Sequence, residues 1–350
     1  MKKTNTLSSL AIAVALGMST TAIASEAPNA PANDTKAVTV NNFVEAEMDA
    51  RLYRFFDEGG LNVGMVFNEV TPTDRQPVPR MNRDTLYAGI QVDTSKGYTI
   101  TIPEHADDRY ASVYILDNEH KTLHILKGSG TTHHFDKQED TRWIAVIPRV
   151  QVFDAKDDAD VAIASNILNQ IKIESGNMQP KPMVNWDWEQ MIELRSQYEV
   201  EMRDSITQYP NDWQGARGEV DRYKGHNMAV ATSWGLFPSS ETVYIAQAPE
   251  LGTDICYSST YQEPENTAFW SITVYNDQGY MFSDDNNINS RVAKQNQDGS
   301  VTMHYGSAEV CGDIDNRLDT TEGWNILMRV YEPDQSVRDG EYLLPPIIAK

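Results

Sequence analysis

The strongest constraint on the fold is a series of short segments in which apolar and polar residues alternate, with no helical segment between them. In Thr85–Asp93, for example, Leu86, Ala88, Ile90 and Val92 fall on one face of an extended chain. Parallel strands are joined by crossovers of a dozen or more residues, so strands this close in sequence are expected to pair antiparallel. Four further segments of this kind follow, at 98–102, 110–116, 123–126 and 142–147.

Helical spacing surrounds and interrupts this pattern. Apolar residues three or four positions apart predict an opening helix that starts near Asn42 and stops at Gly60. After the strands, the same spacing predicts helices at 154–171, 187–209 and 226–234. Alternation then returns, so the chain is ordered β, then α, then β. The later strand-like segments lie at 243–246, 255–261, 268–275, 301–305 and 324–331.

The N-terminus has the features of an export signal. Lys2 and Lys3 form a positively charged start, an apolar stretch covers 7–16, and the small-x-small pattern that ends at Ala24 suits signal peptidase. We therefore predict cleavage after Ala24 and a periplasmic or secreted location. No stretch of the sequence reaches the ~20 apolar residues of a membrane span, so membrane insertion is not expected. Residues 25–41, rich in Ala, Pro, Asn and Thr, are predicted to be a flexible leader.

The charge balance limits the classes of partner. There are 51 acidic and 29 basic side chains, which gives a net charge of −22. Such a surface repels nucleic-acid phosphates and anionic lipid head groups, and the sequence contains no dense basic patch to offset this. Binding to nucleic acids and to membrane surfaces is therefore excluded, and neutral or cationic molecules become the expected ligands.

The sequence contains two cysteines, Cys256 and Cys311. In an oxidising compartment, two cysteines favour one structural disulfide. Closing a loop of about 55 residues would stabilise the fold by about 4 kcal/mol. The alternative is a pair of buried free thiols.

A set of motifs resembles an uncharacterised bacterial family. The motifs are, in chain order, MNRDTLY at 81–87, RYASV at 109–113, AFWSITVY at 268–275, DGS at 298–300, RVY at 329–331 and DG at 339–340. They are similar to proteins that pair a domain of unknown function 1254 (DUF1254) with DUF1214, over most of residues 42–350. The resemblance implies two antiparallel β-sandwich or jelly-roll-like lobes joined by helices. It implies no established reaction.

The periodicity and the resemblance together divide the chain into five parts. These are a signal peptide at 1–24, the leader at 25–41, an N-terminal β-rich domain at 42–150 that resembles DUF1254, a helical insert at 151–235, and a C-terminal β-sandwich domain at 236–350 that resembles DUF1214. One departure concerns Asn316-Arg317-Leu318-Asp319, where the family usually has Asn-Trp-Leu-Pro. An aromatic ring and a proline are lost there.

Candidate functional residues occur at the start of the first long strand. Asn82, Arg83 and Asp84 supply an amide, a guanidinium and a carboxylate, and Tyr87 follows three residues later. We predict that all four bind a ligand, and that Asp84, Arg83 and Tyr87 are the candidates for acid-base catalysis. The alternative is an Arg83–Asp84 ion pair that only fixes the entry to the strand.

Trp270 and Tyr275 are two further ligand-binding candidates. Trp270 shares a strand face with Ile272 and Val274, whereas Tyr275 lies on the opposite face. One face must belong to the core, and the other could form an aromatic floor for sugars or other ring-bearing ligands. Ordinary sandwich packing is the alternative.

No sequence motif indicates a metal, a cofactor or an activated nucleophile. His120 and His124, part of a cluster that also includes His133 and His134, would lie about 13 Å apart on one strand, too far for a shared ion. The acidic run 313–319 contains an arginine at its fifth position and lacks the EF-hand glycine. Nucleophile-elbow, phosphate-loop and dinucleotide-binding patterns are absent from the sequence. We expect neither a metal nor a cofactor.

These features favour an exported cell-envelope protein that binds a small or extended neutral or cationic ligand, glycan-like molecules included, in a cleft between β lobes. Two alternatives are a periplasmic hydrolase or lyase that uses Asp84, Arg83 and Tyr87, and a subunit that docks with another protein. The sequence does not determine the oligomeric state.

Overall fold

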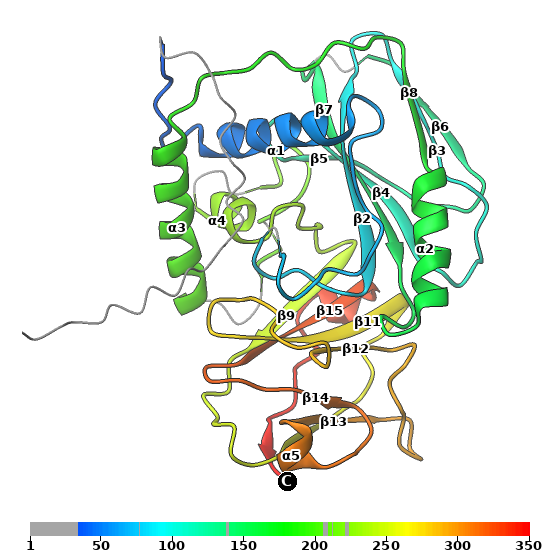
Figure 1. The fold of residues 1–350 in the computed structure, drawn as a ribbon, viewed down its shortest axis with the longest axis vertical. Helices are drawn as coiled ribbons and strands as arrows, with labels where there is room; N and C mark the ends of the chain where they lie inside the picture. Colours follow the sequence, from blue (N-terminus) through cyan, green and yellow to red (C-terminus); the bar gives the residue numbers. More distant parts are fainter. Residues whose placement is uncertain (1–33, 77, 138–139, 206–208, 212, 221–223) are drawn as a thin grey trace, which may run out of the picture.

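The computed structural model describes residues 34–350 except 77, 138–139, 206–208, 212 and 221–223. The predicted signal peptide and the first part of the leader lie outside these residues. Figure 1 shows two β lobes, one above the other, with α1 and α3 beside them. The predicted fold class, mainly β with helices between two lobes, is confirmed. None of the described helices is both long and apolar enough to cross a membrane.

The N-terminal lobe is a sandwich of two antiparallel sheets. Its strands are β1 (Met65–Phe67), β2 (Thr85–Asp93), β3 (Tyr98–Thr101), β4 (Ala111–Leu116), β5 (Thr122–Leu126), β6 (Thr132–Phe135), β7 (Trp143–Gln151) and β8 (Lys172–Ser175). One sheet has the order β1-β2-β7-β4-β5 and the other β6-β3-β8. The face of β2 that the alternation predicted as apolar packs inside the sandwich, where Leu86 and Ile90 share a core with Ile100 of β3.

The N-terminal sandwich continues past residue 150 into the predicted helical insert. Helix α2 (Asp158–Gln170) begins where the Asp157 side chain accepts a hydrogen bond from the Ala159 N–H. Its apolar face, with Ala164 and Ile167, packs into the same core, and β8 then pairs with β3. The first part of 151–235 therefore belongs to this lobe, because its apolar residues complete the N-terminal core.

The C-terminal lobe is a second sandwich. Its strands are β9 (Thr242–Gln247), β10 (Tyr257–Tyr261), β11 (Asn266–Tyr275), β12 (Asn287–Asn289), β13 (Val301–Tyr305), β14 (Arg317–Leu318), β15 (Asn325–Pro333) and β16 (Ile348–Ala349), with short helices α5 (Ala308–Cys311) and α6 (Gln335–Arg338). One sheet has the order β12-β11-β15-β9 and the other β14-β13-β10-β16, and only the β13–β14 pair among these described strands is parallel. The predicted disulfide between Cys256 and Cys311 is confirmed and ties the start of β10 to α5.

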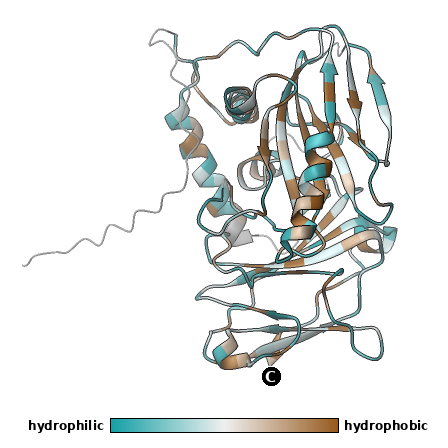
Figure 2. Ribbon diagram, turned by 45° about the vertical axis from the view of Figure 1, so that its right-hand side comes forward, coloured by the Kyte–Doolittle hydropathy of each residue, from teal (hydrophilic) through white to brown (hydrophobic). Residues whose placement is uncertain are grey.

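Three helices lie between and beside the lobes: α1 (Phe43–Gly59), α3 (Trp188–Ser205) and α4 (Gly225–Thr232). Their buried residues form one apolar cluster with the outer faces of both main sheets, to which Ile147 of β7 and Leu327 of β15 belong. Figure 2 shows hydrophobic residues along the strands and mixed colouring on the helices, as amphipathic helices require. The two lobes and the helices therefore share a core.

The predicted flexible leader is too long at its C-terminal end. Lys36 forms a β-bridge with Trp186, and its ammonium lies 3.9 Å from the centre of the Trp186 ring. Val38 is buried in the core shared by the lobes and helices. The chain from Asp34 onward is thus held by apolar burial and backbone pairing, which composition alone did not indicate.

Candidate functional site

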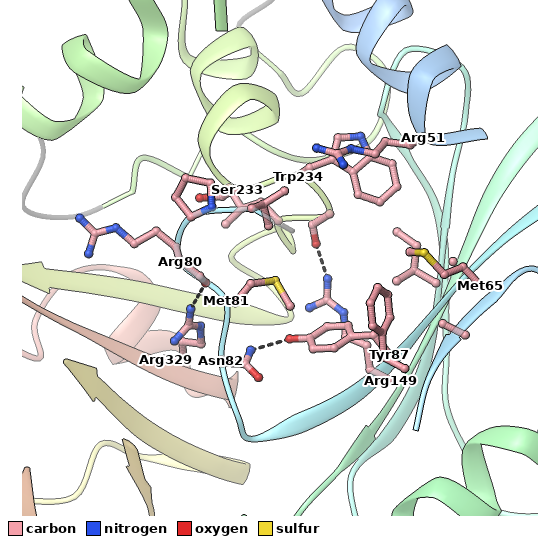
Figure 3. A pocket seen from close by; sticks show the side chains of 18 of the residues that line it. Arg51, Met65, Arg80, Met81, Asn82, Tyr87, Arg149, Ser233, Trp234 and Arg329 are labelled. Carbon is pink, nitrogen blue, oxygen red and sulfur yellow. Dashed lines mark hydrogen bonds between the residues drawn. The ribbon is translucent and has the colours of Figure 1, made fainter. Parts of the chain in front are cut away.

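A cavity lies where the two lobes meet the helices. Its volume is about 130 Å³, roughly ten times the ~10–15 Å³ that one water molecule needs. Residues of α1, β1, β2, β7, β9 and β15 line it, together with the segments 78–82 and 233–236 (Figure 3). Apolar side chains form much of the wall, among them Phe55, Met65, Met81, Trp234 and Leu327.

The charged residues of this cavity have one sign. The described residues that line it include five arginines and no aspartate or glutamate: Arg51, Arg54, Arg80, Arg149 and Arg329. This composition is the reverse of the net charge of −22 of the whole chain. The charge that a ligand would meet therefore depends on which of the guanidinium groups have partners of their own.

Two of the five arginines are directed to partners away from the cavity. Arg54 Nε donates to Glu58 on the same helix at 2.9 Å. Arg80 donates to the side-chain oxygen of Asn325, and its guanidinium points away from the other labelled side chains in Figure 3.

Arg329 is compensated within the protein. Its Nη2 donates to the Arg80 carbonyl oxygen at 2.6 Å and to the Tyr275 hydroxyl at 2.8 Å. The buried Asp84 carboxylate acts on it as a nearby negative charge. This guanidinium therefore has both hydrogen-bond acceptors and a counter-charge.

Arg149 of β7 is only 6 % exposed and has no carboxylate partner among the described residues. Its Nη2 donates to the Gly235 carbonyl oxygen. Its guanidinium carbon lies 3.9 Å from the centre of the Phe237 ring and 5.2 Å from that of Tyr87. No described residue accepts a hydrogen bond from Arg149 Nε. The guanidinium therefore makes one hydrogen bond in the described part of the chain, from Nη2 to Gly235.

Arg51 of α1 is 8 % exposed and forms neither a hydrogen bond nor an ion pair with any described residue. The acid that acts on it, Glu47, is already held through both oxygens by Arg195, at 2.7 and 2.9 Å. Burial, which is the largest effect, lowers the pKa of Arg51 to about 10; Arg195 and Arg54 also lower it, whereas Glu47 opposes the change. Arg51 is thus a buried cation without a close counterion in the described structure.

Tyr87 adds a hydrogen-bond donor beside Arg149. The Asn82 side-chain oxygen accepts the backbone N–H groups of Asp84 and Thr85, at 3.1 and 3.3 Å. This fixes the orientation of the amide, so its nitrogen donates to the Tyr87 hydroxyl at 2.5 Å. Because an amide nitrogen only donates, the Tyr87 oxygen accepts this bond, and among the described residues no group accepts the proton of the Tyr87 hydroxyl.

The loop after α4 holds Arg149 in place. The Gly235 N–H donates to Nε2 of the buried His120 at 2.9 Å, and the carbonyl of the same residue accepts from Arg149. Gly235 has φ +79, and a Cβ added there would lie 3.3 Å from Arg149 Nη2. A glycine is therefore suited to this position both by conformation and by space.

The structure separates the residues that the strand-start motif grouped together. Asn82 and Tyr87 line the cavity, whereas Arg83 and Asp84 are not among the lining residues. Arg83 pairs with Asp284 instead of Asp84. Asp84 is fully buried and accepts a hydrogen bond from Ser271 at 2.5 Å, and burial raises its pKa.

Trp270 and Tyr275 occupy the two faces that the alternation predicted. Trp270 is fully buried with Ile272 and Val274 between the sheets of the C-terminal lobe. Tyr275 lies on the opposite face, where its hydroxyl donates to the Met81 carbonyl oxygen at 2.6 Å and accepts from Arg329. Both faces are therefore core. Tyr275 does not line the cavity itself, but it bonds to Met81 and Arg329, which do.

Two other features noted in the sequence also lie elsewhere. Arg317, in the segment that departs from the family, pairs with Asp285 and Asp319 and does not line the cavity. Across the described residues, no group of three or more His, Cys, Asp or Glu side chains is placed to hold a metal ion.

The sequence did carry a signal for the arginines that it left unassigned. Arg149 falls on the same face of its strand as Ile147, and Arg329 on the same face as Leu327 and Tyr331, all of which line the cavity. Burying a guanidinium on a largely apolar face costs free energy unless another group compensates its charge. Arg51, on a helix rich in charged residues, gave no comparable signal.

The fold and the cavity together define a two-lobed β protein with a ligand-sized space between lobes. Residues 62–137 match the family model described as "Protein of unknown function (DUF1254)", and residues 250–335 match "Protein of unknown function (DUF1214)". Both models therefore match this one chain, in the order that its motifs predicted.

Solved structures show the same architecture. The VPA0106 protein from Vibrio parahaemolyticus is similar with a TM-score of 0.65 and 18 % identity, over 89 % of this chain and 100 % of that one. A putative uncharacterized protein from Burkholderia cenocepacia is similar with a TM-score of 0.55 and 16 % identity, over 88 % of this chain and 87 % of that one. These likenesses establish the fold alone. No curated protein matches the chain significantly.

Proposed function

We propose that this chain is an exported cell-envelope protein that binds a small organic anion in the cavity between its lobes. The observation that carries the proposal is the pair Arg51 and Arg149, both buried at one cavity without a carboxylate partner among the described residues. A buried charge that lacks a counterion costs several kcal/mol. A bound anion would supply the missing charge.

The cavity offers the chemistry that a carboxylate or similar oxyanion needs. A guanidinium binds a carboxylate through two parallel hydrogen bonds, and the free proton of Tyr87 adds a third donor beside Arg149. Phe55, Met65 and Trp234 provide apolar surface for the carbon skeleton. The proposal therefore replaces the neutral or cationic ligand expected from the net charge, because net charge describes the exterior and not this cavity.

Export is supported by the pattern at the N-terminus and by the disulfide between Cys256 and Cys311, which fits an oxidising compartment. We expect the protein purified from its native host to begin at Ser25. An intact N-terminal Met1 in that protein, determined by Edman sequencing or mass spectrometry, would refute export by cleavage.

No contact described above supports either alternative function, the hydrolase or lyase or the docking subunit. Of the three side chains named for a hydrolase or lyase, only Tyr87 lines this cavity, whereas Arg83 pairs with Asp284 and Asp84 accepts from Ser271. The docking role stays a prediction from the sequence.

The test of anion binding compares acids with uncharged molecules of the same shape. Titration calorimetry on the purified protein would measure benzoate against benzamide and hexanoate against hexanamide. We expect at least one acid to bind, with an affinity at least tenfold above that of its amide. Arg149→Gln should reduce acid binding at least tenfold, whereas Arg54→Gln, which removes a lining arginine already paired with Glu58, should leave it within twofold.

The controls make the result interpretable. Circular dichroism and the melting temperature establish that each variant is folded. Equal binding of acids and amides, or an unchanged acid affinity in folded Arg149→Gln, would show that the guanidinium does not select the ligand and would refute the proposed function.

A further inference from the structure

The two unpaired guanidinium groups reach the cavity from different walls. Arg149 extends from β7 of the N-terminal sheet and is held by the carbonyl of Gly235. Arg51 extends from α1, with its guanidinium carbon 5.9 Å from the centre of the Trp234 ring. Figure 3 shows Arg51 entering from the helix side and Arg149 from the sheet side, next to Tyr87. The cavity therefore has two cationic ends.

Each end has hydrogen-bond donors to offer. At the sheet end, the guanidinium of Arg149 makes one hydrogen bond within the described structure, and the Tyr87 hydroxyl, which accepts from Asn82, donates to no described residue. At the helix end, no described residue accepts a hydrogen bond from Arg51. A single carboxylate at either end would leave the other guanidinium buried and uncompensated, at a cost of several kcal/mol.

The remaining charges of the lining do not alter this balance. Glu58 pairs with Arg54, Asp84 acts on Arg329, and Arg80 points outward (Figure 3). Two positive charges are left for a ligand to neutralise. Met65 and Phe55 also line the cavity, so its lining includes apolar surface that suits a hydrocarbon spacer.

Building on the proposed function, we infer that the ligand is a two-ended anion. One anionic group sits at Arg149 and Tyr87, the other at Arg51, and an apolar chain or ring joins them. A dicarboxylate is the simplest compound of this class. Its second carboxylate removes the unpaired charge that a monocarboxylate leaves in place.

The test compares dicarboxylates with monocarboxylates of the same skeleton at neutral pH, where all the carboxyl groups are ionised. The probes are the straight-chain pairs from four to eight carbons, such as adipate with hexanoate, and terephthalate with benzoate. Calorimetry should give at least one dicarboxylate an affinity tenfold or more above its monocarboxylate. Arg51→Gln should remove most of that advantage.

Arg54→Gln is the matched control, because it removes an arginine that lies one turn further along the same helix and is already paired. It should keep the dicarboxylate preference. If Arg51→Gln melts at a much lower temperature than the native protein, Arg51→Met replaces it, since an apolar side chain of similar length preserves the packing. Loss of the preference in folded Arg51→Met supports the inference equally.

The possible failures are distinguishable. Monocarboxylates that bind as tightly as their dicarboxylates would show a single anion site, which overturns the inference and leaves the proposed function intact. A dicarboxylate preference that survives in both Arg51 variants would also overturn it, because the second charge would then act elsewhere. If no acid of either series binds the folded native protein, both the inference and the proposed function fail.

Discussion

The clearest consequence of a buried, unpaired arginine is that its removal should stabilise the ligand-free protein. Arg51→Met replaces the guanidinium with an apolar side chain of similar length at a position that is 8 % exposed. Most large-to-small or polar-to-apolar changes in a core destabilise. The opposite is expected here, because replacing a buried charge by a well-packed apolar group removes a desolvation cost.

The size of the stabilisation expected for Arg51→Met follows from the pKa of Arg51. Burial, reinforced by Arg195 and Arg54 and opposed by Glu47, lowers the pKa of Arg51 to about 10. Relative to an ordinary guanidinium, this lowering corresponds to about 3 kcal/mol against the charged form. The variant also loses the contact of the cation with Trp234, worth about 1 kcal/mol. A net gain of about 2 kcal/mol is therefore expected.

The pH dependence supplies a second measurement. Because the pKa of Arg51 is lower in the folded than in the unfolded state, its cost is complete at neutral pH. The cost falls as the pH rises through about 10, where the folded protein loses the proton and the unfolded chain keeps it. The advantage of Arg51→Met over the native protein should accordingly shrink between pH 9 and pH 11.

Urea unfolding, followed by tryptophan fluorescence at pH 7.5 and at pH 10.5, measures the gain in the free energy of unfolding and its decrease with pH. Arg54→Met is the control, and it should change the free energy of unfolding by less than about 1 kcal/mol because it breaks only an exposed ion pair within one helix. If Arg51→Met unfolds at a lower urea concentration than the native protein while the control is unchanged, Arg51 stabilises the empty cavity. The argument from an uncompensated charge would then be wrong.

Three further predictions concern other parts of the fold. Replacing Cys256 and Cys311 by serine opens a closed loop of 55 positions and should cost up to about 4 kcal/mol, measured by urea unfolding; a loss below 1 kcal/mol would contradict the loop-closure argument. Burial alone would raise the pKa of Asp93, but its hydrogen bonds to Arg142 and to backbone N–H groups lower it to about 2, so this carboxylate stabilises the fold above about pH 4 and the contribution disappears as the pH falls to 2. Asp93→Asn should therefore cost about 2 kcal/mol at pH 7 and almost nothing at pH 2, and an equal cost at both values would refute the assignment. Gly235→Ala, at φ +79, should destabilise by about 1–2 kcal/mol and weaken carboxylate binding in the same calorimetric assay, whereas unchanged binding would mean that this loop does not position the guanidinium.

The elements with a strong local period were predictable from the sequence. The alternation in β2 and β13 is uninterrupted, and the predicted bounds of these strands are those of the structure. The five-strand series before α2 also pairs antiparallel as expected. The alternation of apolar and polar residues reflects the pleat of a single strand. It can therefore be recognised in the sequence without knowledge of the neighbouring strands.

Short strands were not predictable in this way. β1, β6 and β8 each have three or four residues and were not predicted. β6 contains His133 and His134, whose sequence pattern suggested only a metal site, yet it pairs with β3 residue by residue. β8 pairs with the other edge of the same strand. β6 and β8 become strands because β3 offers a hydrogen-bonding edge on each side, and β1 because β2 offers one. The edge is a property of the neighbouring strand and not of the composition of the short segment.

The candidate site was only partly visible for a related reason. Asn82 and Tyr87 were identified because they lie together in one motif. Arg51, Arg149 and Arg329 come from a helix and from two sheets in different lobes, and no local pattern connects them. Their convergence is a result of the shared core, so it could be recognised only once the two lobes were placed against the helices.

The sign of the proposed ligand illustrates what composition can and cannot decide. A net charge of −22 makes the electrostatic potential outside the protein negative. This potential opposes the binding of any polyanion that is too large to enter the cavity. Inside the cavity the nearest charges dominate, since low polarisability strengthens short-range interactions and salt screens them little. Arg51 and Arg149 therefore outweigh a far larger number of distant carboxylates. An acidic exterior and a cationic cavity are compatible, and together they favour small anions over nucleic acids and anionic membranes.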